Sequence, residues 1–160
     1  MSYFYISIGT NITPEKLAVT ITQKLCERYG SIFIYPFVYT SPIKMNSNMP
    51  FLNSLAVIKY NLDENQIKNS FNKIETSLGR NRDDPYSPIK DRVADIDIIY
   101  KSEEFNLNFF SKSKEPFNKK VLEGKKIFSS ASLPIQRPST IDLDRTTGDI
   151  IILSDKVNCF

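Results

Sequence analysis

Two aspartates separated by one residue are the clearest candidates for chemistry in this sequence. Asp95 and Asp97 flank Ile96 in the apolar, β-branched run at residues 93–100, which is typical of a strand. Because successive side chains of a strand point to opposite faces, both carboxylates share one face, roughly 7 Å apart, and Ile96 and Ile98 share the other. Hard divalent cations such as Mg²⁺ bind such carboxylates together with phosphate oxygens. The alternative is an ordinary strand with a solvated acidic face.

Three arginines surround this acidic pair in the sequence. Arg80 and Arg82 precede it, and Arg92 stands directly ahead of the strand. Guanidinium groups bind phosphate oxygens in a bidentate geometry, so cations beside paired carboxylates suit a magnesium–nucleotide site. The alternative is that these arginines neutralise nearby acidic residues such as Glu75. The spacing alone favours neither interpretation.

A second group of residues suits a flat ligand. Phe51 and Asn53 share one face of the strand expected at residues 51–60 and could hold a heterocycle by stacking and hydrogen bonds, or belong to the core and a capped loop. Tyr86 is a further ligand contact or a surface residue. Residues 9–11, Gly-Thr-Asn, are expected to form a turn that presents backbone amides after the first strand, but they are not a P-loop.

Composition limits the chemistry and the class of protein. The 160 residues include no histidine and two cysteines, Cys26 and Cys159, without CxxC spacing. Histidine-dependent nucleophiles, zinc sites and a disulfide framework are therefore excluded, and we expect plain thiols. Chemistry must depend on carboxylates, Lys, Arg, Tyr and metals.

The length predicts one domain over residues 1–160. No apolar run approaches the ~18 residues of a membrane span, and the first residues lack a signal peptide's basic region, so we expect a cytoplasmic protein without a membrane partner. The net charge of +3 does not predict nucleic-acid binding, and the expected strand at 51–60 lacks the paired aromatics of an RNA-binding sheet.

Six elements are expected to position these residues. They are strands at 3–8, 31–40, 51–60 and 93–100 and helices at 13–29 and 63–78. Thr13 is expected to cap the first helix and Gly30 to end it, and Asp63 is expected to cap the second helix together with Gln66. Strand, helix, strand, strand, helix, strand is the signature of a ferredoxin-like α+β sandwich, an antiparallel sheet with helices on one face. Pro36 predicts an edge position or a bulge in the second strand. The C-terminal extension holds six lysines and two glutamates at 112–126 and an expected hairpin at 141–153.

Taken together, these segments resemble the 6-hydroxymethyl-7,8-dihydropterin pyrophosphokinase family of folate biosynthesis. The resemblance covers residues 3–100 and rests on IGTN at 8–11, YTSP at 39–42, FLN at 51–53, IE at 74–75, GRNR at 79–82 and RVADIDI at 92–98. It implies a ferredoxin-like fold and transfer of pyrophosphate from ATP, the co-substrate, to the hydroxymethyl group of a reduced pterin. The implied partners are these two small molecules, and we expect a monomer.

The resemblance also implies a role for each matched residue. Asp95 and Asp97 would bind two Mg²⁺ ions, Arg80, Arg82 and Arg92 would contact ATP phosphates, and Glu75 would orient the site. Thr40, Ile43, Phe51 and Asn53 would line the pterin pocket, with Tyr86 taking the stacking role of a family Trp that this chain lacks. Ile98, Lys119 and Lys120 would contact ATP, the lysines following Pro116-Phe117, where the family has Pro-His.

Two functions from different classes follow. The first is the Mg²⁺- and ATP-dependent pyrophosphokinase, with a different alcohol as an alternative substrate because residues 41–50 are unusual. The second is a divergent paralogue that has lost ATP-dependent catalysis and serves as a pterin-binding or regulatory module. The missing family His and Trp motivate the second hypothesis.

Overall fold

The computed structural model describes residues 1–30, 32–40, 49–81, 83, 85, 94–124, 131–133, 141–144, 148 and 150–152. Its strands are β1 (Ser2–Thr10), β2 (Ile32–Ile34), β3 (Val38–Thr40), β4 (Phe51–Tyr60), β5 (Asp95–Ser102), β6 (Ala131–Leu133), β7 (Ile141–Leu143) and β8 (Ile150–Ile152). Its helices are α1 (Pro14–Tyr29), α2 (Glu64–Ser77), the 3₁₀ helix η2 (Leu107–Lys112) and α3 (Pro116–Gly124).

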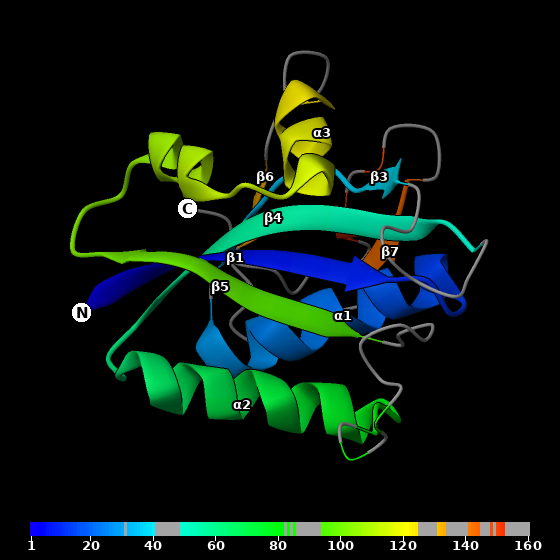
Figure 1. The fold of residues 1–160 in the computed structure, drawn as a ribbon, viewed down its shortest axis with the longest axis horizontal. Coiled ribbons are helices and arrows are strands. Elements are labelled where there is room, and N and C mark those ends of the chain that lie inside the picture. The colour runs from blue at the N-terminus through cyan, green and yellow to red at the C-terminus, as the bar shows by residue number, and fades with distance from the viewer. Residues whose placement is uncertain are drawn as a thin grey trace.

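The main sheet has the strand order β5-β1-β4-β2-β6, with β3 paired to β4 beside β2. The pairings of β1 with β4 and β5, and of β4 with β2 and β3, are antiparallel. Helices α1 and α2 cover one face, whereas η2 and α3, from the last third of the chain, lie on the other (Figure 1). The predicted ferredoxin-like α+β fold is confirmed.

The segment predicted as one strand at 31–40 forms two strands instead. Tyr35, Pro36 and Phe37 separate β2 from β3, because proline lacks the N–H that a continuous ladder needs. Other groups satisfy the interrupted backbone, since the Ser54 hydroxyl donates to the Tyr35 carbonyl at 2.6 Å and the Phe37 N–H donates to the Gly148 carbonyl at 2.7 Å. The C-terminal hairpin is present as β7 paired with β8.

The two long helices begin differently. Asp63 forms a complete capping box with Gln66, at 2.8 Å from the Gln66 N–H and 3.0 Å back to the Asp63 N–H, as its sequence predicts. The expected side-chain cap at Thr13 is wrong, because this residue is left-handed with φ 42° and its side chain makes no capping hydrogen bond. Gly30 ends α1 with φ 80°, as expected.

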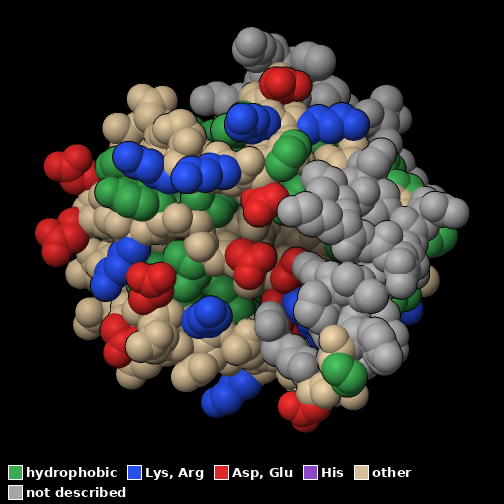
Figure 2. Space-filling model, in the orientation of Figure 1, with side chains coloured by type: hydrophobic (Ala, Val, Ile, Leu, Met, Phe, Trp, Pro, Cys, Tyr) green, Lys and Arg blue, Asp and Glu red, His purple; other side chains and the backbone are tan. Residues whose placement is uncertain are grey.

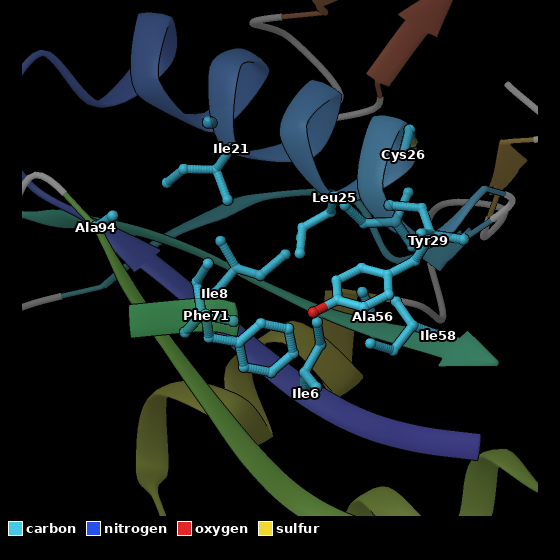
Figure 3. Close-up of a cluster of buried hydrophobic side chains, with 14 of the residues drawn as sticks. Ile6, Ile8, Ile21, Leu25, Cys26, Tyr29, Ala56, Ile58, Phe71 and Ala94 are labelled. Atoms are coloured by element: carbon cyan, nitrogen blue, oxygen red, sulfur yellow. The ribbon is translucent and has the colours of Figure 1, made fainter. Parts of the chain in front are cut away.

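Two clusters of buried side chains hold the layers together. The cluster between the sheet and α1 and α2 includes Ile6, Ile8, Leu25, Ile58 and Phe71 (Figure 3). The cluster under η2 and α3 consists of Tyr5, Tyr35, Leu55, Val57, Phe110 and Val121. Both faces of β1 and β4 are therefore buried over much of their length, which keeps the sheet rigid beneath any site built on it.

The cysteine that the structure describes is a core residue. Cys26 is a free thiol with 1% exposure, and burial raises its pKa to about 12. It is therefore an apolar packing residue and no nucleophile at neutral pH, in agreement with the expectation of a plain thiol. Cys159 lies outside the described residues. None of the described helices combines the length and apolar character that crossing a bilayer requires.

The capping box makes a stability prediction. Asp63→Ala removes the acceptor of the Gln66 N–H and is expected to lower the free energy of unfolding by about 1 kcal/mol. Urea denaturation followed by circular dichroism measures the change. Asn69→Ala, at an exposed position in the same helix, is the control and should leave stability within about 0.5 kcal/mol of the parent. Equal stability of Asp63→Ala and the parent would contradict the assigned cap.

Candidate active site

Strand register places the predicted site residues in a row across the sheet. Gly9 of β1 pairs with Asn53 of β4 on one side and with Asp95 of β5 on the other, and Ser7 pairs with Asp97. Directly paired residues project to the same face. The row lies on the face that carries η2 and α3, because the neighbouring Ile8 belongs to the cluster under α1 and α2.

Gly9 corrects one expectation from the sequence. The turn predicted at residues 9–11 is absent at its first two positions, since β1 continues to Thr10. Gly9 is therefore a strand residue paired on both sides. The alternation of side chains that the prediction used for Asp95 and Asp97 extends unbroken through this part of β1 and β5.

The residues expected around a flat ligand meet at β3 and β4. Thr40 pairs with Phe51, and the Asn53 side-chain amide donates a hydrogen bond to the Thr40 hydroxyl. All three are buried, with exposures of 6% for Thr40, 8% for Phe51 and 4% for Asn53. The Asn53 amide is thus held in one orientation at the site. Ile43 and Tyr86 lie outside the described residues.

Arg80 joins the two acidic elements of the site. Its Nη1 donates to Asp95 Oδ1 at 2.9 Å and to the Ala94 carbonyl at 3.0 Å, and lies 3.4 Å from Glu75 Oε1. The same Glu75 oxygen accepts the Ile96 N–H at 2.8 Å. Glu75 therefore ties the end of α2 to the start of β5, and it holds Arg80 against the acidic strand. Arg82 and Arg92 lie outside the described residues.

A cavity of about 610 Å³ opens beside the carboxylates. Its sheet side is lined by Ser7, Asp95, Asp97, Ile98 and Ile99, and its other side by Lys112, Ser113, Lys114, Glu115, Phe117 and Asn118. On the face of the molecule that Figure 2 shows, acidic side chains gather in the middle, and Lys or Arg side chains lie above them over η2 and α3. The volume is in the range of small-molecule sites.

The cavity includes lysines that the sequence reasoning missed. All four lysines at 112, 114, 119 and 120 are exposed, but only Lys112 and Lys114 belong to the described lining of the cavity. The sequence signal that could have identified them is the pair of lysines on either side of Ser113, just before the helix that begins at Pro116. Ile98 does line the cavity.

Asn118 is a second residue that the sequence did not single out. It has 2% exposure, and its Nδ2 donates to the Ser113 hydroxyl at 2.7 Å. Its Oδ1 has no hydrogen-bond partner among the described residues, which leaves a buried acceptor in the cavity wall. Phe117 lines the cavity as well.

The donor set fits a magnesium ion that shares its coordination with a substrate. Asp97 is exposed, the Asp95 side chain retains 19% exposure, and both line the cavity. No group of three or more His, Cys, Asp or Glu side chains able to hold a metal occurs in the described part of the chain. Two carboxylates without further protein ligands match Mg²⁺, which keeps waters and binds phosphate oxygens.

Phosphoryl-transfer enzymes use metal-binding carboxylates together with Lys and Arg side chains. This site has paired carboxylates, a buried guanidinium and a lysine-lined cavity on an antiparallel α+β sheet. The family model of 7,8-dihydro-6-hydroxymethylpterin-pyrophosphokinase (HPPK) matches residues 5–142, and the chain belongs to this family. It is therefore an ATP-dependent pyrophosphokinase, as the resemblance implied.

Curated relatives agree with the family. The chain is 30% identical to the 2-amino-4-hydroxy-6-hydroxymethyldihydropteridine pyrophosphokinases of two Porphyromonas gingivalis strains over 104 residues. The aligned region is 64% of this chain and 71% of each relative. The family match continues into the last third of the chain, beyond residues 3–100, which carry the resemblance described above.

The Glu75 contacts generate a prediction. Glu75→Ala removes both the partner of Arg80 and the acceptor of the Ile96 N–H and is expected to cost about 3 kcal/mol of stability. Glu75→Gln keeps an acceptor for Ile96 but loses the charge, so its cost should be smaller, about 1 to 2 kcal/mol. Chemical denaturation compares them, with the exposed Glu64→Gln of the same helix as control. If both Glu75 variants lost the same free energy of unfolding, the hydrogen bond from the Ile96 N–H would make no separate contribution to stability.

Proposed function

We propose that this enzyme transfers the pyrophosphoryl group of ATP to the hydroxymethyl group of 6-hydroxymethyl-7,8-dihydropterin, with Mg²⁺, forming AMP and the pterin diphosphate used in folate synthesis. One observation carries the proposal. The row Asn53–Gly9–Asp95 puts an amide suited to a pterin edge and a carboxylate suited to a metal–phosphate complex on one face of three adjacent strands. As part of the proposal, the enzyme is cytoplasmic and monomeric.

The pterin end of the site works by orientation. The Asn53 amide, fixed by Thr40, is placed to hydrogen-bond the ring edge, and Phe51 provides an apolar surface beside it. Because the amide is held before substrate arrives, little orientational freedom is lost on binding. Ile43 and Tyr86 complete this pocket in the proposal, on the basis of the family resemblance.

The phosphate end works by charge. Asp95 and Asp97 would hold two Mg²⁺ ions, which when bound neutralise phosphate charge and polarise the reacting oxygens. Arg80 keeps the Asp95 carboxylate in place through its hydrogen bond and is a candidate for phosphate contact, together with Arg82 and Arg92. The proposal assigns Glu75 to positioning through Arg80 and through the Ile96 backbone.

The transfer itself needs no histidine. The pterin hydroxyl oxygen attacks the β-phosphorus, the bond from that phosphorus to the α,β-bridging oxygen breaks, and AMP leaves with that oxygen. The hydroxyl proton passes to solvent. The contributions of the chain are alignment of the hydroxyl with the phosphorus and compensation of charge, which dominate catalysis of phosphoryl transfer.

We assign the nucleotide to the cavity next to the carboxylates. Lys112 and Lys114 supply cations on the wall opposite Asp95 and Asp97, and Phe117 supplies an apolar contact. Ile98 also lines the cavity, with its side chain packed toward the cluster under α1 and α2. Lys119 and Lys120, which the resemblance brought forward, would contribute from the exposed side of α3.

The presence of Phe117 in the cavity, at the family's His position, favours one competing hypothesis, a module that binds pterin without catalysis. Mixing the enzyme with ATP, Mg²⁺ and 6-hydroxymethyl-7,8-dihydropterin decides between them. Stoichiometric AMP and pterin diphosphate, resolved by chromatography, are the expected products. Pterin binding without AMP formation would establish the competing hypothesis.

The carboxylates make the sharpest mutational prediction. Asp95→Asn and Asp97→Asn are each expected to lower kcat by at least about 10²-fold, because the ligand set for the ions is lost, while the circular dichroism spectrum stays that of the parent. Glu103→Gln, which removes an exposed carboxylate just after the same strand, is the matched control and should keep full activity. Near-parental turnover in either Asp variant would reject the two-ion assignment.

The two pairs of lysines can be separated experimentally. Lys112→Ala combined with Lys114→Ala is expected to weaken binding of an ATP analogue by roughly tenfold or more, because two phosphate-facing cations are lost. Lys119→Ala combined with Lys120→Ala changes net charge equally and should weaken it by a few-fold at most. Calorimetric titration with Mg²⁺ and a non-hydrolysable analogue provides the values. A larger effect of the Lys119 and Lys120 substitutions would show that the phosphates contact α3 instead.

A further inference from the structure

Gly9 occupies a position where a glycine needs an explanation. It lies inside β1 and is paired on both sides, to Asn53 and to Asp95. Its φ is not positive, unlike that of Gly30, Gly79 and Gly148, so the backbone does not demand a glycine. Glycine weakens a strand interior and commonly marks a close approach of another group. The reason for Gly9 therefore lies in what stands over it.

The space over Gly9 is occupied by the Asn53 side chain. A Cβ atom built on Gly9 would lie 2.8 Å from Asn53 Oδ1 and 3.5 Å from Phe51 Cδ1. Asn53 has little freedom to move aside, because it is 4% exposed and its Nδ2 is hydrogen-bonded to Thr40. A methyl group at position 9 would therefore displace the amide oxygen or break its link to Thr40.

We propose that Gly9 is a positioning residue for the pterin substrate, acting through Asn53. Because Gly9 has no side chain, the Asn53 amide can lie over β1, toward Asp95. In this orientation it would hydrogen-bond the edge of the pterin ring. This inference rests on the proposed function, in which Asn53 binds the pterin. It adds a specificity-determining position that acts on the substrate through another residue.

Sheet geometry gives Gly9 a second consequence. Neighbouring strands are about 4.8 Å apart, so Asn53 and Asp95, one strand to either side of Gly9, are roughly 10 Å apart along the sheet. A pterin held at Asn53 must extend its hydroxymethyl group across β1 to reach phosphates beside Asp95. The Asn53 side chain that covers Gly9 therefore has to leave this crossing open, and it can do so because Gly9 carries no side chain of its own.

Gly9→Ala tests the proposal by a binding measurement. We expect its dissociation constant for 6-hydroxymethyl-7,8-dihydropterin, titrated with Mg²⁺ and a non-hydrolysable ATP analogue present, to rise 10- to 100-fold, as expected for a misplaced orienting group. The dissociation constant for the ATP analogue should change less than about twofold, because the lysines of the cavity lie elsewhere.

Gly30→Ala is the matched control for lost stability. A Cβ on Gly30 meets no atom within 4 Å, but its φ of +80° strains an alanine. This variant should melt at a lower temperature yet bind the pterin like the parent. Weakened pterin binding in Gly30→Ala would show that general destabilisation explains the Gly9 result and would overturn the proposal.

A double-mutant cycle shows whether Gly9 acts through Asn53. Asn53→Ala removes the group that a methyl at position 9 displaces, so Gly9→Ala in the Asn53→Ala background should have no further effect on pterin affinity. This pair decides the question even where Gly9→Ala alone does not fold. A further loss of pterin affinity in the double variant relative to Asn53→Ala alone overturns the proposal.

The parent protein separates failure of this inference from failure of the proposed function. A parent that binds the pterin, with Gly9→Ala binding equally well, overturns the role of Gly9 alone. A parent that does not bind the pterin overturns the proposed function and the inference together.

Discussion

The position of β1 between β4 and β5 is the constraint on which the whole site depends. Asn53 and Asp95 reach the same face only because each pairs with Gly9 in its present register. A slip of one residue in either pairing would turn the amide or the carboxylates toward α1 and α2, since side chains alternate along a strand. Burial of Ile8 and Ile96 in the core opposes such a slip, so hydrophobic packing on one face fixes the chemistry on the other.

Charge is distributed in two opposed groups across the cavity. Among the described residues on the sheet side, Asp95 and Asp97 face the guanidinium of Arg80, which also interacts with the buried Glu75. On the opposite side, Lys112 and Lys114 outnumber the one carboxylate of the described lining there, Glu115. A cation held by the carboxylates and an anion facing the lysines fit this arrangement together, which is the charge pattern of a metal–nucleotide complex.

The last third of the chain completes the site by packing on the second face of the sheet. The Tyr5 hydroxyl accepts the Asn106 N–H at 2.7 Å and donates to the Glu104 carbonyl at 2.9 Å, and its ring contacts Phe110 edge-on at 5.3 Å. These contacts anchor the segment that continues into Lys112 and α3. A core tyrosine of β1 thereby links the cavity wall that carries Lys112 and Lys114 to the strand that carries Gly9 and Ser7.

Much of the fold could be predicted from local patterns. The capping box at Asp63, the helix stop at Gly30 and the alternation around Ile96 each depend on neighbours in the chain, and the structure confirms all of them. The expectation at Pro36 was only partly right, and the side-chain cap expected at Thr13 was wrong. The ladder of β4 and the carbonyl of Gly148 determine how the chain passes Pro36, and these partners are distant in sequence.

The sequence by itself determined the α+β class and a pair of carboxylates on one face of a strand, because both follow from short-range periodicity. Only the tertiary structure decided that Asn53 lies across Gly9 from Asp95, that Glu75 holds Arg80 and the Ile96 backbone, and that Lys112 and Lys114 line the cavity while Lys119 and Lys120 lie outside its described lining. These relations depend on strand pairing and on the packing of α3, which bring together residues that no local pattern relates.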